Sequence, residues 1–221
     1  MAKLTIVGAG PGSPEYVTPV ARKAVQEALL VIGAERSLSL FREDIRGETL
    51  SLTAKNVDEA LKYAVESAKN GKNVSLLSTG DPGFSGLLGS VLKRSLDKTF
   101  EITVVAGISS LQACAARLCM SWDNVALFAF HDGTDNKKKR ELLKAAKTGK
   151  NVLLLPEPKA FSPREIASYL IQAGVDKRTS VVVCENLTLS NEEVIETTLE
   201  EASKQNFASL CVMVIKGNLK N

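Results

Sequence analysis

A strand, a tight loop and a helix start follow one another around Gly80-Asp81-Pro82, and this stretch constrains the fold most. The apolar run at 74–77 has the length of a strand, and the glycines and proline that follow end it abruptly. Apolar residues then recur at helical spacing from Leu87. A carboxylate at such an apex is typical of ligand-binding loops off the carboxyl ends of strands in open α/β sheets. The same residues also suit a tight turn in which Asp81 only hydrogen-bonds its own backbone.

Strands alternate with helices through the first half of the chain, which predicts a mostly parallel sheet. Expected strands lie at 4–7, 29–33, 74–77 and 102–105, and expected helices begin near 18, 35, 56 and 87, the last ending at Ser95. Thr18 before Pro19 is a favourable helix start. Asn56 with Glu59 resembles a capping box, and Gly71 suits the end of that helix.

The second half is again α/β but has more strands late on. Strands are expected at 125–130, 152–155, 180–184, 193–198 and 210–215, with helices at 137–147 and from Ser162 to Gly174. Ser162, Pro163 and Glu165 form a full capping-box pattern. Three strands with one short helix between them predict an antiparallel or mixed sheet. The pattern pauses at 120–124, so we expect an N-terminal domain at 1–119 and a C-terminal domain at 120–221.

Composition excludes several classes of function. A net charge of +3 and an aromatic content of 5% do not indicate nucleic-acid binding. No apolar run approaches the length of a membrane span, and the N-terminus enters a strand without the pattern of a signal peptide, so we expect a cytoplasmic protein. Four cysteines without a C-x-x-C pair predict buried free thiols. The basic block 137–140 is expected to be a solvated helix face, or else a patch that meets an acidic substrate.

The loops leave little room for familiar catalytic machinery. The Gly8-x-Gly10 loop lacks the third glycine of a dinucleotide fingerprint, since Ser13 stands there, although an NAD(P)-dependent oxidoreductase remains an alternative. No Gly-Lys-Ser/Thr marks a P-loop, no Gly-x-Ser-x-Gly elbow occurs, and a single histidine argues against a metal centre. Glycine loops rich in exposed main-chain groups suit a polar, zwitterionic ligand, bound with or without turnover.

Three motifs together resemble those of the tetrapyrrole methylases. Gly8-Ala9-Gly10-Pro11-Gly12, Gly80-Asp81-Pro82 and the segment 106–110 (Ala-Gly-Ile-Ser-Ser) stand in that family's order and spacing, and the likeness runs over nearly the whole chain. The segments 31–36 and 109–118, with Trp122 and His131-x-Gly133, resemble the cobalamin branch, in particular the enzymes that methylate C5 of cobalt-precorrin-7. The chain has His131-Asp132-Gly133 where that subgroup tends to have His-Gly-Arg, and Thr188 where it has glycine.

The resemblance implies two α/β domains that bind S-adenosylmethionine in a cleft between them, and it assigns residues to that site. The expected cofactor-binding residues are Pro11, Gly80, Asp81, Phe84, Ser109, Ser110, Leu155, Asn186, Leu187 and Ala208. For Leu155 and Leu187, plain core packing is the alternative. Arg36 and Arg117 are the expected contacts for the substrate's carboxylates, and His131 is a candidate for proton removal or for holding a substrate carboxylate.

The resemblance also implies a reaction and partners. The expected activity is S-adenosylmethionine-dependent C-methylation of a cobalt-precorrin at C5, with methylation of another tetrapyrrole position as the alternative. The diphthamide branch, whose substrate is a protein, fits the segment 109–118 less well. A homodimer, and a separate C15-methylating decarboxylase as functional partner, are expected by the same resemblance. No metal site is expected.

Overall fold

The computed structural model describes residues 2–94, 99–131 and 133–217. The chain forms two compact units, Met1–Ser109 and Ser110–Asn221. The expected domain boundary at 119/120 follows helix α5 (Ser110–Arg117), whereas the division into compact units precedes it. Helix α5 falls in the second unit because it packs against two strands there, β7 (Val152–Leu155) and β10 (Cys211–Ile215). Within the described residues, no helix is both long and apolar enough to cross a membrane.

The first unit is built on a five-stranded sheet in the order β3-β2-β4-β1-β5, in which every pairing is parallel. Its strands are β1 (Lys3–Gly8), β2 (Leu30–Gly33), β3 (Glu48–Ser51), β4 (Val74–Ser78) and β5 (Glu101–Val105). This confirms the predicted parallel sheet. Strand β3 was not predicted, because its four residues, Glu-Thr-Leu-Ser, are largely polar, and the first two are exposed at the sheet edge.

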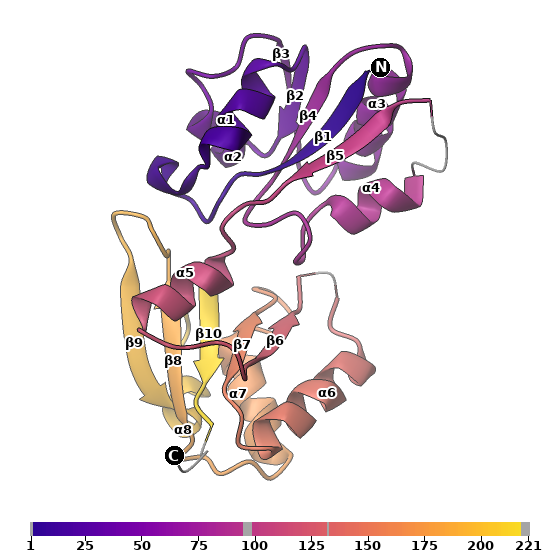
Figure 1. Ribbon diagram of the computed structural model, residues 1–221. Helices are drawn as coiled ribbons and strands as arrows, with labels where there is room; N and C mark the ends of the chain where they lie inside the picture. The colour runs from indigo at the N-terminus through magenta and orange to yellow at the C-terminus, as the bar shows by residue number, and fades with distance from the viewer. Residues whose placement is uncertain (1, 95–98, 132, 218–221) are drawn as a thin grey trace. The chain divides into compact units, whose positions relative to one another are not determined.

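Helices cover both faces of this sheet (Figure 1). Helices α1 (Pro19–Gln26) and α2 (Glu35–Leu40) pack on one face, around Val7, Val31 and Leu77. Helices α3 (Val57–Lys69) and α4 (Leu88–Arg94) pack on the other, around Ile6, Ile32 and Leu76. Alternate residues of the inner strands therefore face opposite cores, which explains why β2 and β4 are buried along their whole length.

The ends of the helices test the capping predictions. The Thr18 hydroxyl accepts a hydrogen bond from the Ala21 N–H at 3.2 Å, and Gly71 after α3 has φ +88°, so both predictions are confirmed. The predicted Asn56–Glu59 capping box is wrong. The Asn56 carboxamide oxygen instead accepts the Thr53 N–H at 2.7 Å, which satisfies the preceding turn rather than the helix. The predicted end of α4, Ser95, lies outside the described residues.

The second unit holds a five-stranded sheet that is mixed, one of the two expected kinds, with the strands in the order β6-β7-β10-β8-β9. Among the described strands, β6 (Ala126–Ala129) and β7 pair in parallel. Strand β10 pairs antiparallel with β7 and with β8 (Ser180–Glu185), and β8 pairs antiparallel with the edge strand β9 (Glu193–Thr198). Helices α6 (Asn136–Lys147), α7 (Pro163–Gln172) and α8 (Leu199–Ala202) cover one face with an apolar core that includes Phe130 and Phe161. The Glu165 carboxylate accepts the Ser162 N–H at 3.1 Å, as predicted for a capping box.

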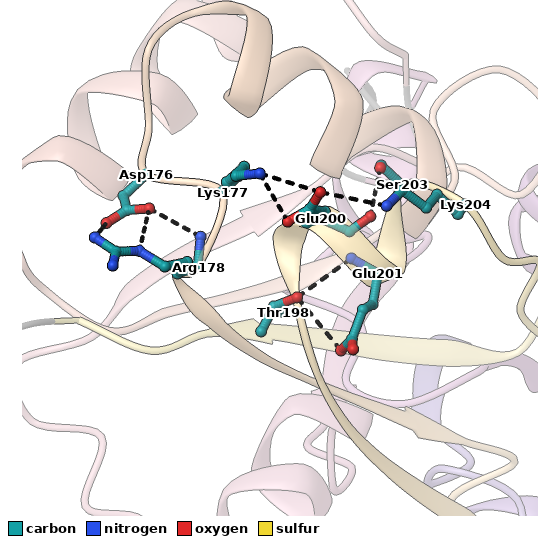
Figure 2. A network of polar contacts seen from close by, with 8 residues as sticks. All are labelled: Asp176, Lys177, Arg178, Thr198, Glu200, Glu201, Ser203 and Lys204. Carbon is teal, nitrogen blue, oxygen red and sulfur yellow. Dashed lines mark hydrogen bonds and ion pairs between the residues drawn. The ribbon is translucent and has the colours of Figure 1, made fainter.

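One end of the β8–β9 pair carries a surface network of charged and hydroxyl side chains (Figure 2). Ser180 pairs with Thr198 at this end, and Glu185 pairs with Glu193 at the other. Glu200 forms ion pairs with Lys177 at 3.1 Å and with Lys204 at 3.3 Å. All these charges are exposed, so solvent screens each pair and it contributes little to stability. The network joins the loop before β8 to helix α8. It does not include the opposite end of the strand pair, where Glu185 and Glu193 lie.

Candidate functional site

Three glycine loops meet at the carboxyl ends of β1, β4 and β5. The Gly80 N–H donates to the Gly10 carbonyl oxygen at 2.9 Å, and the Ala9 N–H donates to the Ser78 carbonyl oxygen at 2.8 Å. The third loop approaches so closely that a Cβ atom on Gly107 would lie 2.2 Å from the Gly80 carbonyl oxygen and 2.6 Å from the Gly8 Cα. Glycine is therefore required here by the contact of backbone with backbone. The three motifs singled out in the sequence form one continuous rim.

The Asp81 carboxylate ties two of these loops together. Its Oδ1 accepts the Gly83 N–H at 2.8 Å, which is the local turn that the sequence allowed. Its Oδ2 accepts the Gly107 N–H at 3.1 Å, from the loop after β5. Asp81 therefore does more than close its own turn: it fixes the second loop against the third.

The other predicted residues of the first unit lie around the same rim. Pro11 and Phe84 are half-buried in the first and second loops, and Ser109 is buried just before α5. Arg36, at the start of α2, is exposed, and its guanidinium donates to the Thr79 hydroxyl at 3.4 Å. The strand order explains this grouping, because parallel strands place the loops that follow them at one edge of the sheet.

The predicted residues of the second unit also gather at one edge of their sheet. Leu155 ends β7, and Asn186 and Leu187 follow β8. Since β10 runs antiparallel to both strands, its start lies at the same edge, with Cys211 opposite Glu185. The Asn186 N–H donates to the Leu210 carbonyl oxygen at 2.8 Å, and the Ala208 N–H donates to the Glu185 carboxylate at 2.6 Å. Residues from three separate segments are thereby held together.

Leu155 and Leu187 are buried, with 8% and 7% of their surface exposed. Neither belongs to the apolar core that α6, α7 and α8 build on the sheet. Leu155 lies on the opposite face of β7 from Leu154, which does belong to that core. The two leucines are thus buried at the sheet edge, apart from the unit's principal core.

The turn after β8 has an anchor that the sequence did not reveal. Glu192 Oε2 accepts the Thr188 N–H and Oε1 accepts the Arg117 Nε–H, both at 2.7 Å. The bond from Thr188, together with the Arg117 guanidinium, holds the pKa of the Glu192 carboxyl below its ordinary value. Arg117, a predicted substrate contact, is therefore engaged within the unit. No local motif marks Glu192, because its partners lie 4 and 75 residues away.

His131 is exposed in a turn after β6, and its neighbour Asp132 lies outside the described residues. The basic block near it divides by role. The Lys138 ammonium donates to the Ala129 carbonyl oxygen at 2.7 Å, and the Lys139 ammonium lies 4.4 Å from the centroid of the Phe161 ring. Lys137 and Arg140 are exposed. The side chains of Lys138 and Lys139 thus contact the protein itself, whereas those of Lys137 and Arg140 face solvent.

We expect Lys138→Ala to lower the free energy of unfolding by about 1 kcal/mol, because it removes a charge-assisted hydrogen bond to a main-chain carbonyl group. Lys137→Ala is the matched control: it removes an exposed positive charge from the first turn of the same helix, where the macrodipole disfavours cations. Urea unfolding of both variants measures the difference. An equal response of the two variants would contradict the structural role of Lys138.

The cysteines occupy different environments. Cys114 and Cys184 are buried with their sulfur atoms 3.7 Å apart, and the hydrogen bond between them together with burial raises the pKa of the Cys114 thiol. Burial raises the pKa of Cys211 to about 12. The prediction that all four are buried is wrong for Cys119, which is exposed after the end of α5, and Cys211 is only half-buried. Within the described residues, no group of three or more His, Cys, Asp or Glu side chains could hold a metal ion.

Comparison with known proteins identifies relatives of this architecture. Over 215 residues the chain is 40% identical to a probable cobalt-precorrin-7 C(5)-methyltransferase of Methanocaldococcus jannaschii, covering 96% of this chain and 97% of the relative. It is 25% identical to the cobalt-precorrin-4 C(11)-methyltransferase of the same organism, covering 99% of this chain and 88% of that protein. Among solved structures, the precorrin-6Y methylase CbiE of Archaeoglobus fulgidus matches with a TM-score of 0.73 and 26% identity, covering 98% of this chain and 99% of that one. The model of the tetrapyrrole (corrin/porphyrin) methylases matches residues 3–203, and the chain belongs to that family.

Proposed function

We propose that this protein is an S-adenosylmethionine-dependent methyltransferase that methylates C5 of cobalt-precorrin-7. The observation that carries the proposal is the 40% identity, over nearly the full length of both chains, to a relative named for that reaction. The relative from the same organism that is named for C11 methylation is only 25% identical. This difference favours C5 over the alternative, another position on the tetrapyrrole ring.

The loop rim of the first unit suits the proposed cofactor. Gly8, Gly80 and Gly107 bring the main chain of the three loops into contact, and the hydroxyl-bearing Ser109 and Ser110 follow the third loop in the sequence. Amide and hydroxyl groups of this kind pair with the carboxylate, ammonium and adenine groups of S-adenosylmethionine. Pro11, Gly80, Asp81 and Phe84 complete the proposed contacts here. In the second unit, Leu155, Asn186, Leu187 and Ala208 form the proposed contacts, with Leu187 buried and therefore offering chiefly its main chain.

When bound, S-adenosylmethionine supplies a methyl group on a positively charged sulfur for transfer to a nucleophilic carbon. The chain's part is to align the reactants and to exclude water. Asp81 is suited to alignment, because both of its oxygens already accept main-chain N–H groups. An anion directed at the sulfur would stabilise the ground state more than the transition state. His131 is proposed to hold a substrate carboxylate or to accept a proton, and the exposed Arg36 to attract the substrate's carboxylates.

Calorimetric titration with S-adenosylhomocysteine, with NADH in parallel, tests the cofactor. We expect micromolar binding of the first and none of the second. Incubation with cobalt-precorrin-7 and S-adenosylmethionine labelled with ¹³C in its methyl group then tests the reaction, and carbon NMR of the product locates the label. A label at C5 supports the proposal, whereas a label at another ring carbon assigns the alternative position. Binding of NADH alone would contradict the whole assignment.

The proposed partners follow from the same reaction. We propose a homodimer, which light scattering coupled to gel filtration measures directly. A separate enzyme that methylates C15 and removes a carboxyl group is proposed to act on the same ring. Addition of such an enzyme to the labelled reaction should consume the C5-methylated product, and failure to consume it would exclude that order of steps.

A further inference from the structure

The turn between β8 and β9 contains two residues in backbone conformations that L-amino acids rarely adopt. Asn186 has φ +50° and Thr188 has φ +69°. Asparagine tolerates the left-handed region, but a β-branched residue there is a genuine outlier. Such conformations persist only where the surroundings impose them. A contact with the surroundings must therefore hold Thr188 at positive φ.

Glu192 makes that contact. Its carboxylate accepts the Thr188 N–H at 2.7 Å with one oxygen and the Arg117 Nε–H at 2.7 Å with the other. Its own N–H donates to the Leu189 carbonyl oxygen at 3.0 Å, and its side chain is only 23% exposed. The carboxylate is thus fixed by its backbone on one side and by a guanidinium on the other. The carboxylate therefore accepts the N–H of a residue with a strained backbone conformation, Thr188, from a fixed position.

This contact joins two segments of the second unit. Arg117 ends α5, the helix that begins at Ser110, whereas Thr188 directly follows Asn186 and Leu187. The buried Cys114–Cys184 contact joins the same helix to the last buried residue of β8. Helix α5 is therefore held to strand β8 by one contact and to the turn after it by the other. Of these two contacts, that of Glu192 reaches the strained residue directly, through the Thr188 N–H.

We propose that Glu192 is a positioning residue, which holds the Asn186–Thr188 turn in the conformation that binds S-adenosylmethionine. This inference rests on the proposed function. Without the carboxylate, Thr188 returns to an ordinary backbone conformation, and Asn186 and Leu187 move with it. The apparent affinity for the cofactor then falls in proportion to the fraction of molecules that keep the competent turn.

A double-mutant cycle between positions 188 and 192 tests the proposal, with S-adenosylhomocysteine as the probe. We expect Glu192→Ala to raise the dissociation constant roughly tenfold, the size expected when one strained residue is released. Thr188→Gly alone should bind at least as tightly as the parent, because glycine adopts positive φ without cost. Combining Thr188→Gly with Glu192→Ala should restore most of the lost affinity. Glu193→Ala, one position further on and exposed, is the matched control and should bind like the parent.

Amide hydrogen exchange of the segment 186–191, measured without ligand, provides a second readout. Exchange should be faster in Glu192→Ala than in the parent, and slower again when Thr188→Gly is added. The proposal is overturned if Glu192→Ala binds the probe like the parent, or if its loss of affinity is the same in the Thr188→Gly background. If the parent itself binds no S-adenosylhomocysteine, the proposed function and the positioning role both fail. Faster exchange in Glu192→Ala would then mark Glu192 as a folding contact only.

Discussion

Replacing Gly107 with alanine is expected to destabilise the first unit by about 3 kcal/mol, at the upper end of the cost of overpacking. The new Cβ would lie 2.2 Å from the Gly80 carbonyl oxygen and 2.6 Å from the Gly8 Cα. Both neighbours are main-chain atoms, so no side-chain rotation can relieve the clash. The loops must separate, which also breaks the bond from the Gly107 N–H to Asp81. We therefore expect lower thermal stability together with loss of S-adenosylhomocysteine binding.

Gly89→Ala is the matched control for this experiment. Gly89 lies in α4 of the same unit, and an added Cβ there has no neighbouring atom within 4 Å. Because alanine favours helix more than glycine does, this variant should gain up to about 1 kcal/mol. Thermal unfolding and calorimetric titration of the two variants provide the comparison. A Gly107→Ala protein as stable as the parent would mean that the three loops do not meet as described.

Asp81→Ala is expected to weaken S-adenosylhomocysteine binding about tenfold or more while leaving the unit folded. The substitution leaves the Gly83 and Gly107 N–H groups without their carboxylate acceptor, at a cost of about 1–3 kcal/mol each where water cannot replace it. Asp81 is half-buried, so water reaches part of this space and moderates the loss of stability. The larger effect falls on the relative position of the second and third loops, and hence on affinity.

Asp81→Asn separates the charge of this side chain from its role as an acceptor. The asparagine oxygen can still accept one N–H group, but its amide nitrogen cannot accept the other. Binding should therefore be intermediate between the parent and Asp81→Ala. If Asp81→Asn and Asp81→Ala both bind like the parent, Asp81 serves only its own turn, which is the simpler interpretation of the motif.

Much of the fold could be predicted from local pattern. The buried strands of the first unit are continuous apolar runs, and glycine or proline ends most of them, so their positions followed from the sequence. Strand β3 escaped prediction because an edge strand needs little apolar surface. Asn56 shows the limit of short motifs. Its side chain could bond either to the start of the helix or to the preceding turn, and in the structure it accepts the Thr53 N–H of the turn. Spacing along the chain does not encode that competition.

The candidate site divides in the same way. Short motifs in the sequence were enough to single out Asp81 and the glycine loops, and the structure brings these loops together at one sheet edge. Glu192 could not be predicted. One of its partners is a main-chain N–H group of the preceding turn, and the other, Arg117, lies 75 residues away in a helix. Arg117 shows the converse: the family resemblance implied a substrate contact, whereas in the structure it pairs with Glu192. A charged side chain acquires its role from a partner that only the fold supplies.

The contact of Gly8, Gly80 and Gly107 also bears on how such a protein can evolve. The contacts of this rim are made by main-chain atoms. A substitution at one of the three glycines can therefore disrupt the contacts, but it cannot alter them in small steps. New substrate preferences must then arise from side chains rather than from these three glycines. Selection for a different ring position should therefore accumulate changes around the proposed substrate contacts, Arg36 and His131, and leave the three glycines untouched.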